Sequence, residues 1–179
     1  MKLIMLDVDA VVADLHAEWL RLYNHDYNDQ LMVEEITDWD MTKFVKPECG
    51  KSIYKYLEFP DLYNQIQPID GALSGVKHLR SLGHRVVFAT SGTYSHPKYH
   101  WLVRNDFDPG EWGRDYMVVH DKGLLKGDLL IDDRPKNIED FGSPKSIIFS
   151  QPWNKTFFWN YRAESWHDVT RIIYDFDRL

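Results

Sequence analysis

Short apolar runs that end abruptly in polar residues recur along this chain. Such runs are typical of strands that are covered on both faces, as in a parallel sheet. The first run ends in Asp7 and Asp9, which are one residue apart. We predict strands at residues 1–6, 85–89, 128–131 and 145–149, and a weaker one at 115–119.

Amphipathic segments with helical spacing alternate with these runs. They predict helices at residues 11–23, 71–82, 98–105 and 166–176, and Gly83 is a C-terminal stop signal for the second. Strands that alternate with helices imply βαβ units with right-handed crossovers. We therefore predict an α/β, Rossmann-like fold with a parallel sheet and helices on both faces.

Residues 24–68 break this alternation. Polar and aromatic residues are mixed there, helical stretches such as 51–57 are short, and no alternating strand stands out. We interpret the segment as a small helical cap inserted after the first strand–helix unit, with residues 1–23 and 69–179 as the core. A chain of 179 residues suits one domain with such an insertion.

Composition narrows the classes of function. The formal net charge of −7 argues against binding to polymeric nucleic acid or to a membrane surface. A single cysteine, Cys49, excludes an internal disulfide and a zinc cluster, and no long apolar run predicts a membrane span or a signal peptide. We expect a cytoplasmic protein. The aromatic content of 15% suits a large core or a pocket that stacks a flat ligand.

Polar residues with chemical potential follow the predicted strands. The carboxyl ends of parallel strands share one edge of a sheet, where ligands collect. The residues expected to converge there are Asp7, Asp9, Thr90, Lys122, Asp132 and Asp133. Carboxylates gathered in one crevice repel one another and need a compensating cation, and an all-oxygen ligand set favours Mg²⁺.

The same set of residues suits phosphoryl transfer. The Thr90 hydroxyl and the backbone N–H groups of Ser91 and Gly92 could bind phosphate oxygens, and Lys122 adds a positive charge. One carboxylate could attack phosphorus while a second moves the proton. An isolated Asp-x-Asp more often ends a strand and caps a helix, so only the ordered recurrence supports this interpretation.

The order of these motifs resembles the haloacid dehalogenase (HAD) superfamily of Mg²⁺-dependent phosphatases. More closely, the chain resembles the 5′(3′)-deoxyribonucleotidases. The segments that carry the resemblance are residues 7–14, 88–91, 121–122 and 129–135, followed by 149–154 and 165–166.

The resemblance implies roles for individual residues. Asp7 would be the nucleophile and a Mg²⁺ ligand, and Asp9 would be the general acid/base and bind Mg²⁺ through its backbone carbonyl. Thr90, Ser91 and Lys122 would hold the phosphoryl group. Asp132 and Asp133 would complete the metal site, with Asp133 favoured as the direct ligand and Asp132 left open. Cap aromatics stack the base in this family, and the candidates here are Trp39, Phe44 and Tyr63.

Two positions depart from the family pattern. Ala10 stands where the family has glycine, which is tolerable if its φ is negative and costly if its φ is positive. Gly92 stands where proline follows Thr-Ser. Neither change removes a reacting atom.

Several alternatives stay open. The protein could act on another small phosphate ester, or could be a HAD-fold binding module that has lost activity. The order of the motifs argues against a receiver-type signalling module, in which the paired acids and the phospho-accepting aspartate come in the reverse order.

We expect a small-molecule nucleotide substrate, and whether the protein forms a homodimer stays open. The histidines 16, 96, 100 and 120 are interpreted as surface or supporting residues, and residues 153–159 as packing for the C-terminal helix rather than a binding strip. Arg134-Pro135 is interpreted as ending the strand and anchoring a loop.

Overall fold

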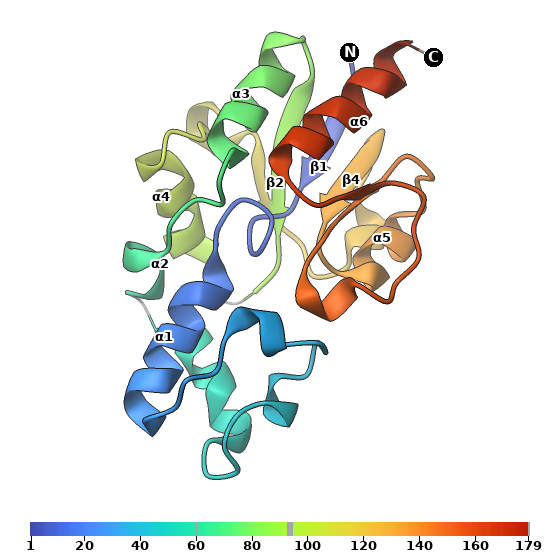
Figure 1. Cartoon of the computed structure of the whole chain (residues 1–179). Coiled ribbons are helices and arrows are strands. Elements are labelled where there is room, and N and C mark those ends of the chain that lie inside the picture. Colours follow the sequence, from blue (N-terminus) through green and yellow to red (C-terminus); the bar gives the residue numbers. More distant parts are fainter. Residues whose placement is uncertain (60, 93–94, 179) are drawn as a thin grey trace.

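The computed structural model describes residues 1–59, 61–92 and 95–178, with the side chain of Ser95 left aside. Its centre is a six-stranded sheet in the order β3-β2-β1-β4-β5-β6, and every neighbouring pair is parallel (Figure 1). The strands are β1 (Leu3–Leu6), β2 (Arg85–Thr90), β3 (Tyr116–Val118), β4 (Leu129–Asp132), β5 (Ile147–Phe149) and β6 (Arg162–Ala163).

Strand β1 lies inside the sheet between β2 and β4. Its Leu6 is in register with Phe88 on one side and Ile131 on the other. Side chains alternate between the two faces, so Leu6 joins the larger hydrophobic cluster and Met5 the opposite, smaller one. Both faces are buried, which explains the uninterrupted apolar run.

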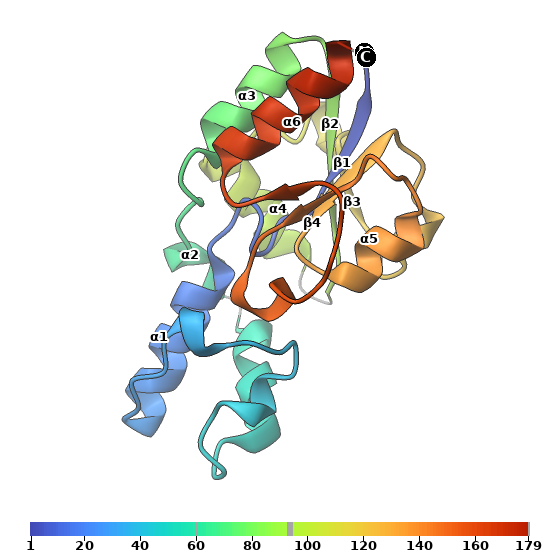
Figure 2. The same cartoon turned by 45° about the vertical axis from the view of Figure 1, so that its right-hand side comes forward.

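Helices cover the two faces of the sheet. On one face α3 (Ala72–Ser81) and α6 (Trp166–Arg178) lie side by side (Figures 1 and 2). On the other face α5 (Pro135–Phe141) contributes Ile138 to the smaller cluster. Helix α4 (Ser95–Arg104) follows β2 and buries Trp101 and Leu102 in the larger cluster.

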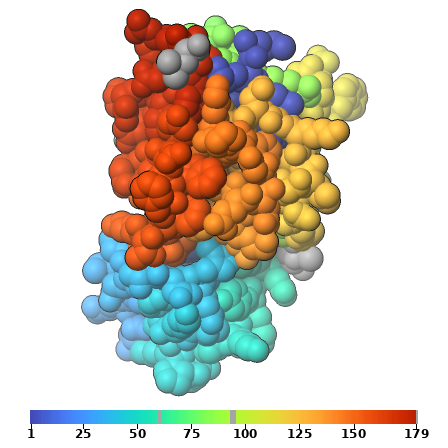
Figure 3. All heavy atoms as spheres, turned by 90° about the vertical axis from the view of Figure 1, so that its right-hand side faces the viewer, coloured from blue at the N-terminus to red at the C-terminus, as the bar shows by residue number. Residues whose placement is uncertain are grey.

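The cap forms a lobe below the sheet, coloured blue to cyan in Figure 3. Helix α1 (Leu15–Tyr27) leads into it, 3₁₀ turns at 33–35, 41–43 and 50–58 follow, and α2 (Leu62–Gln65) returns to the core. A separate hydrophobic cluster joins Trp19 and Tyr23 of α1 to Ile53 and other cap residues. Because α1 packs into that cluster, it supports the cap as well as the core, and the division at residues 24–68 stays a prediction.

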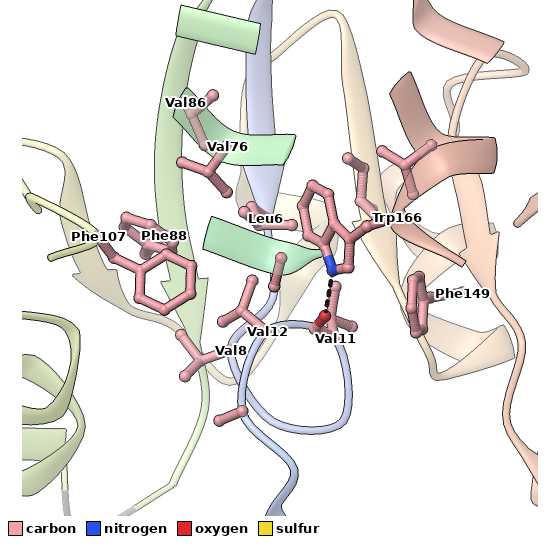
Figure 4. Close-up of a cluster of buried hydrophobic side chains, with 14 of the residues drawn as sticks. Leu6, Val8, Val11, Val12, Val76, Val86, Phe88, Phe107, Phe149 and Trp166 are labelled. Carbon is pink, nitrogen blue, oxygen red and sulfur yellow. Dashed lines mark hydrogen bonds between the residues drawn. The ribbon is translucent and has the colours of Figure 1, made fainter. Parts of the chain in front are cut away.

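Trp166, at the start of α6, connects the closing helix to the loop after β1. Its indole Nε1 donates to the backbone oxygen of Val11 at 2.8 Å, and Figure 4 shows the ring among the buried side chains of the core. Gly75 of α3 lies against the same ring, where a Cβ would come within 2.4 Å of Trp166 Cε3. The absence of a side chain at position 75 therefore allows the two helices to approach.

The predicted fold class is confirmed, and all five predicted strands are present. The first helix begins at Leu15 rather than Val11, because residues 11–13 form a tight loop in which Val12 and Ala13 both donate to the Val8 oxygen. Strand β6 and helix α5 were not predicted. Pro135 begins α5, where its fixed φ suits the first helical position, so interpreting Arg134-Pro135 as a loop anchor was wrong. No helix in the described ranges is long and apolar enough to cross a membrane.

Candidate active site

The buried carboxylates at the ends of β1 and β4 form one cluster, which we call the acidic corner. It comprises Asp7, directly after β1, Asp132, the last residue of β4, and Asp133. An oxygen from each lies within 4.8 Å of the others, and all three residues are buried. The parallel pairing of β1 with β4 produces this convergence, since Asp7 N donates to Ile131 O at 2.9 Å.

Lys122 neutralises part of this charge. It begins the 3₁₀ turn after β3, and its side chain is 1% exposed. Its Nζ lies 2.7 Å from Asp7 Oδ1 and 2.5 Å from Asp132 Oδ2. Burial alone would lower the pKa of Lys122, but the charges of Asp7 and Asp132 raise it above its ordinary value. The lysine is therefore charged and bridges the two strand ends.

Asp132 has partners for both carboxylate oxygens. Asn137 Nδ2, on α5, lies 3.1 Å from each oxygen, and the backbone N–H of Arg134 donates to Oδ1 at 2.8 Å. With Lys122 on Oδ2, this carboxylate is fully engaged by the protein. Asp133 differs, because its carboxylate accepts from Trp153 alone among the described side chains.

The acidic corner has the chemistry of a hard-cation site. Burial raises the pKa of Asp7 to about 7, although the charge of Lys122 opposes this rise. Burial and the neighbouring charge of Asp132 raise the pKa of Asp133 well above its ordinary value. The corner thus holds more buried negative charge than Lys122 compensates. Carboxylate oxygens are the ligands that Mg²⁺ prefers, so the donor set fits that ion.

Asp9 lies apart from the acidic corner and has its own partners. Tyr63 donates its hydroxyl proton to Asp9 Oδ1, and Lys98 Nζ lies 2.6 Å from Oδ2. Burial and the Asp9 charge raise the pKa of Tyr63 well above its ordinary value, so the phenol stays protonated as a donor. Asp7 and Asp9 are therefore each paired with a different lysine.

Lys98 is a site residue that the sequence analysis missed. Lys98 lies on α4. Its Nζ contacts Asp9, the Thr90 hydroxyl at 3.0 Å and the Ser91 backbone oxygen at 2.6 Å. It is 7% exposed. The available signal was its position shortly after a strand that ends in Thr90-Ser91, at the start of a helix. In the sequence, Lys98 stands out only as the first residue of a predicted helix.

The loop after β1 holds a strained residue. Ala10 has φ of 56°, in the left-handed region, so the costly alternative considered for this position applies. Its N–H donates to Ala13 O at 2.8 Å, and its own oxygen accepts from Gln151 Nε2 at 2.7 Å. These bonds hold the loop in place despite the missing glycine.

A cavity of about 340 Å³ opens beside the carboxylates and extends under the cap. The carboxylates of Asp7, Asp9 and Asp133 are among its lining groups. The rings of His16, Trp39 and Trp153 also line it, and we call these three residues the aromatic wall. The Trp153 ring lies 4.0 Å from that of His16 and 6.3 Å, edge-on, from that of Trp39. A flat group could bind against this wall while its charged end reaches the acidic corner.

The three predicted base-stacking aromatics occupy different places. Trp39 is 48% exposed and lines the cavity, with the Arg134 guanidinium 4.9 Å above its ring. Tyr63 also lines the cavity, but it is buried and bonded to Asp9. Phe44 packs against the hydrophobic cluster of the cap and is not among the cavity-lining residues. Thr90 and Ser91 lie together at the end of β2, with Ser91 at the cavity.

His16 and Trp153 were not predicted to lie at the site. Burial lowers the pKa of His16 to about 4, and its Nδ1 is buried without a hydrogen-bond partner in the described structure. Trp153 lines the cavity instead of packing the C-terminal helix. His16 lies in the first turn of α1 and Trp153 in the turn after β5, and no repeat in the sequence indicates that these two side chains turn toward the cavity.

Two solved structures with this architecture are HAD proteins. The magnesium-bound HAD-hydrolase YfnB of Bacillus subtilis is 17% identical, with a TM-score of 0.61 and coverage of 96% of this chain and 98% of that one. A haloacid dehalogenase-like protein of Agrobacterium tumefaciens is 13% identical, with a TM-score of 0.67 and 98% coverage of both chains. The fold is that of the HAD hydrolases.

Comparison of sequences identifies the family of this chain more specifically than comparison of folds does. The family model for the 5′ nucleotidase, deoxy (pyrimidine), cytosolic type C proteins matches residues 1–177, and the chain belongs to this family of phosphoric monoester hydrolases. A 5′(3′)-deoxyribonucleotidase of Clostridium acetobutylicum is 34% identical over 93% of this chain and 92% of that protein. The cytosolic human 5′(3′)-deoxyribonucleotidase is 26% identical over 98% of this chain and 94% of that protein.

Proposed function

We propose that this protein is a Mg²⁺-dependent phosphatase that hydrolyses nucleoside 5′-monophosphates, preferentially deoxyribonucleotides. The observation that carries the proposal is a single cavity that is lined both by carboxylates of the acidic corner and by the aromatic wall. Such a cavity suits a ligand with an anionic phosphate and a flat base. The names of the relatives support the same substrate class.

Asp7 is the nucleophile in this proposal. Its carboxylate attacks phosphorus, the bond from phosphorus to the sugar oxygen breaks, and the leaving oxygen takes a proton from Asp9. Asp9 then removes a proton from water, whose oxygen attacks the phosphoaspartate, and inorganic phosphate leaves as the bond to Asp7 breaks. Tyr63 and Lys98, which contact the two Asp9 oxygens, orient this carboxylate.

Asp7, Asp133 and the backbone carbonyl of Asp9 would hold Mg²⁺. When bound, the ion neutralises charge on the phosphoryl oxygens and on the acidic corner. Asp133 is the better candidate for the direct ligand. Both carboxylate oxygens of Asp132 already accept hydrogen bonds, from Lys122, Asn137 and the backbone N–H of Arg134. Thr90, Ser91 and Lys122 would contact the phosphoryl group.

A phosphate-release panel tests the proposal. The purified protein is assayed with dUMP, dTMP, UMP, 3′-nucleotides and sugar phosphates, with Mg²⁺ and after chelation. We expect release from the 5′-deoxyribonucleotides only with Mg²⁺, and a loss of at least about 10⁴-fold in Asp7→Asn, since the covalent step is lost. Faster turnover of a sugar phosphate would favour another small ester as substrate. If the wild-type protein hydrolysed no compound faster than Asp7→Asn does, the protein would be a binding module without activity.

The partners and location belong to the same proposal. The substrate is a free nucleotide rather than a polymer, in agreement with the net charge of −7. A cytoplasmic location is supported by the name of the human relative, and fractionation of the source cells would test it.

A further inference from the structure

Trp153 belongs to the aromatic wall and also contacts the acidic corner. It lies in the 3₁₀ turn Pro152–Asn154, after β5, and is 8% exposed. Its Nε1 donates to Asp133 Oδ2 at 2.8 Å, while one face of its ring lies against His16 in the cavity. A single side chain thus contacts both a carboxylate of the acidic corner and another ring of the aromatic wall.

The indole is the Asp133 carboxylate's sole side-chain donor in the described part of the chain. Without it, the carboxylate could rotate about its Cβ–Cγ bond, because neither Lys122 nor Asn137 donates to it. With Oδ2 held, Oδ1 is left to bind a cation in a defined direction. Hydrogen bonds of this kind orient metal-ligating carboxylates and sustain their affinity for the ion.

The turn that carries Trp153 is itself held in place. Asn154 Nδ2 donates to the backbone oxygens of Asp133, at 2.7 Å, and Phe149, at 2.8 Å. Arg162, on β6, donates to Asn154 Oδ1 at 2.8 Å and to its backbone oxygen at 3.0 Å. The turn therefore binds both the backbone and the side chain of Asp133, so the indole keeps its direction.

We propose that Trp153 is a positioning residue for the metal site, one that holds the Asp133 carboxylate in the orientation that Mg²⁺ binding requires. The proposal rests on the proposed function, because it takes Asp133 as a metal ligand. If Trp153 merely filled space in the cavity wall, a phenyl ring would replace it without an effect on the metal.

The test compares Trp153→Phe with Trp159→Phe. Trp159 also donates an indole N–H to the protein, to Ser146 O at 2.6 Å, but it does not line the cavity, so it is a matched control. Mg²⁺ binding to each metal-free protein is measured by calorimetry without substrate. We expect the dissociation constant to rise by about 10–100-fold in Trp153→Phe and by less than about twofold in Trp159→Phe.

A second replacement separates the hydrogen bond from packing. Benzothienylalanine at position 153 keeps the bicyclic shape of the side chain and removes its N–H, so it should weaken Mg²⁺ binding as much as phenylalanine does. Because its shape is unchanged, it tests the hydrogen bond even if Trp153→Phe folds poorly. Unchanged affinity in this variant overturns the positioning role while the wild-type protein still binds Mg²⁺. A wild-type protein that binds no Mg²⁺ overturns the proposed function as well.

Discussion

The acidic corner and the aromatic wall are built by different means. The corner consists of residues at the ends of adjacent parallel strands, and its charges are tied together by Lys122 and the groups on α5. The wall is assembled from the first turn of α1, a cap segment and the turn after β5, and its rings meet by stacking. The corner thus depends on the pairing of parallel strands, and the wall on packing between segments that are distant in the sequence.

This difference predicts separate effects on kinetics. Removing a charge near Asp7 or Asp9 should change the chemical step, because in the proposed mechanism these charges act on the reacting atoms. Removing a ring from the wall should change substrate binding while leaving the chemical step largely intact. If both kinds of change altered kcat and KM to the same extent, the separation between the acidic corner and the aromatic wall would be contradicted.

The largest effect among these variants is expected at Lys98, which extends the charged end of the site to Asp9. Lys98→Met keeps an unbranched side chain that is one atom shorter and removes the charged group that contacts Asp9, Thr90 and Ser91. We expect kcat to fall by about 10²–10³-fold, as for the loss of one preorganised electrostatic partner. Steady-state kinetics would measure it, with the exposed Lys77→Met as control. A fall of less than about tenfold would show that Lys98 only packs there.

A smaller effect, confined to binding, is expected in the wall. Trp39→Ala should raise KM for dUMP by about 10-fold and leave kcat nearly unchanged, because stacking of a base on an aromatic ring contributes about 1–3 kcal/mol. Phe44→Ala is the matched variant from the same segment. It should leave KM unchanged and lower the free energy of unfolding by about 1–3 kcal/mol, because Phe44 packs in the cap cluster instead.

The reverse result would be informative. If Phe44→Ala raised KM and Trp39→Ala did not, the cap would have to move on binding so that Phe44 enters the cavity.

The smallest effect is expected at Ala10, where the two regions join. Ala10→Gly removes the strain of a positive φ, and it also removes a buried methyl group that packs in the cap cluster. We expect the free energy of unfolding to rise by less than about 1 kcal/mol in a urea titration. A loss of stability would mean that methyl packing outweighs the strain, and Ala10→Val, with its β-branched side chain, should be destabilising in either case.

Much of the core and of the acidic corner could be predicted, for a physical reason. Buried parallel strands require continuous apolar runs, so Asp7, Asp132 and Asp133 were recognisable as the polar residues that end them. The convergence of strand ends then followed from topology. Strand β6, with two residues, has no such run, and α5 is short enough that Pro135 looked like the end of an element.

The aromatic wall could not be predicted in the same way. His16 lies on a helix whose spacing indicates only which side is apolar, and Trp153 lies in a turn whose direction depends on Asn154 and Arg162. Trp39, Phe44 and Tyr63 were chosen as aromatics in the cap, and the sequence does not distinguish a ring at a cavity from one in a cluster. Tertiary packing decides these positions.

The place of β1 inside the sheet also bears on how the protein folds. The strand that leads to Asp7 is the first of the six along the chain, yet its two neighbours, β2 and β4, lie far from it in the sequence. The loop after it is held by Trp166, which comes later still. Contacts of such wide sequence separation form slowly, because the intervening loop must close first. Regain of turnover during refolding should therefore lag behind the return of helical signal.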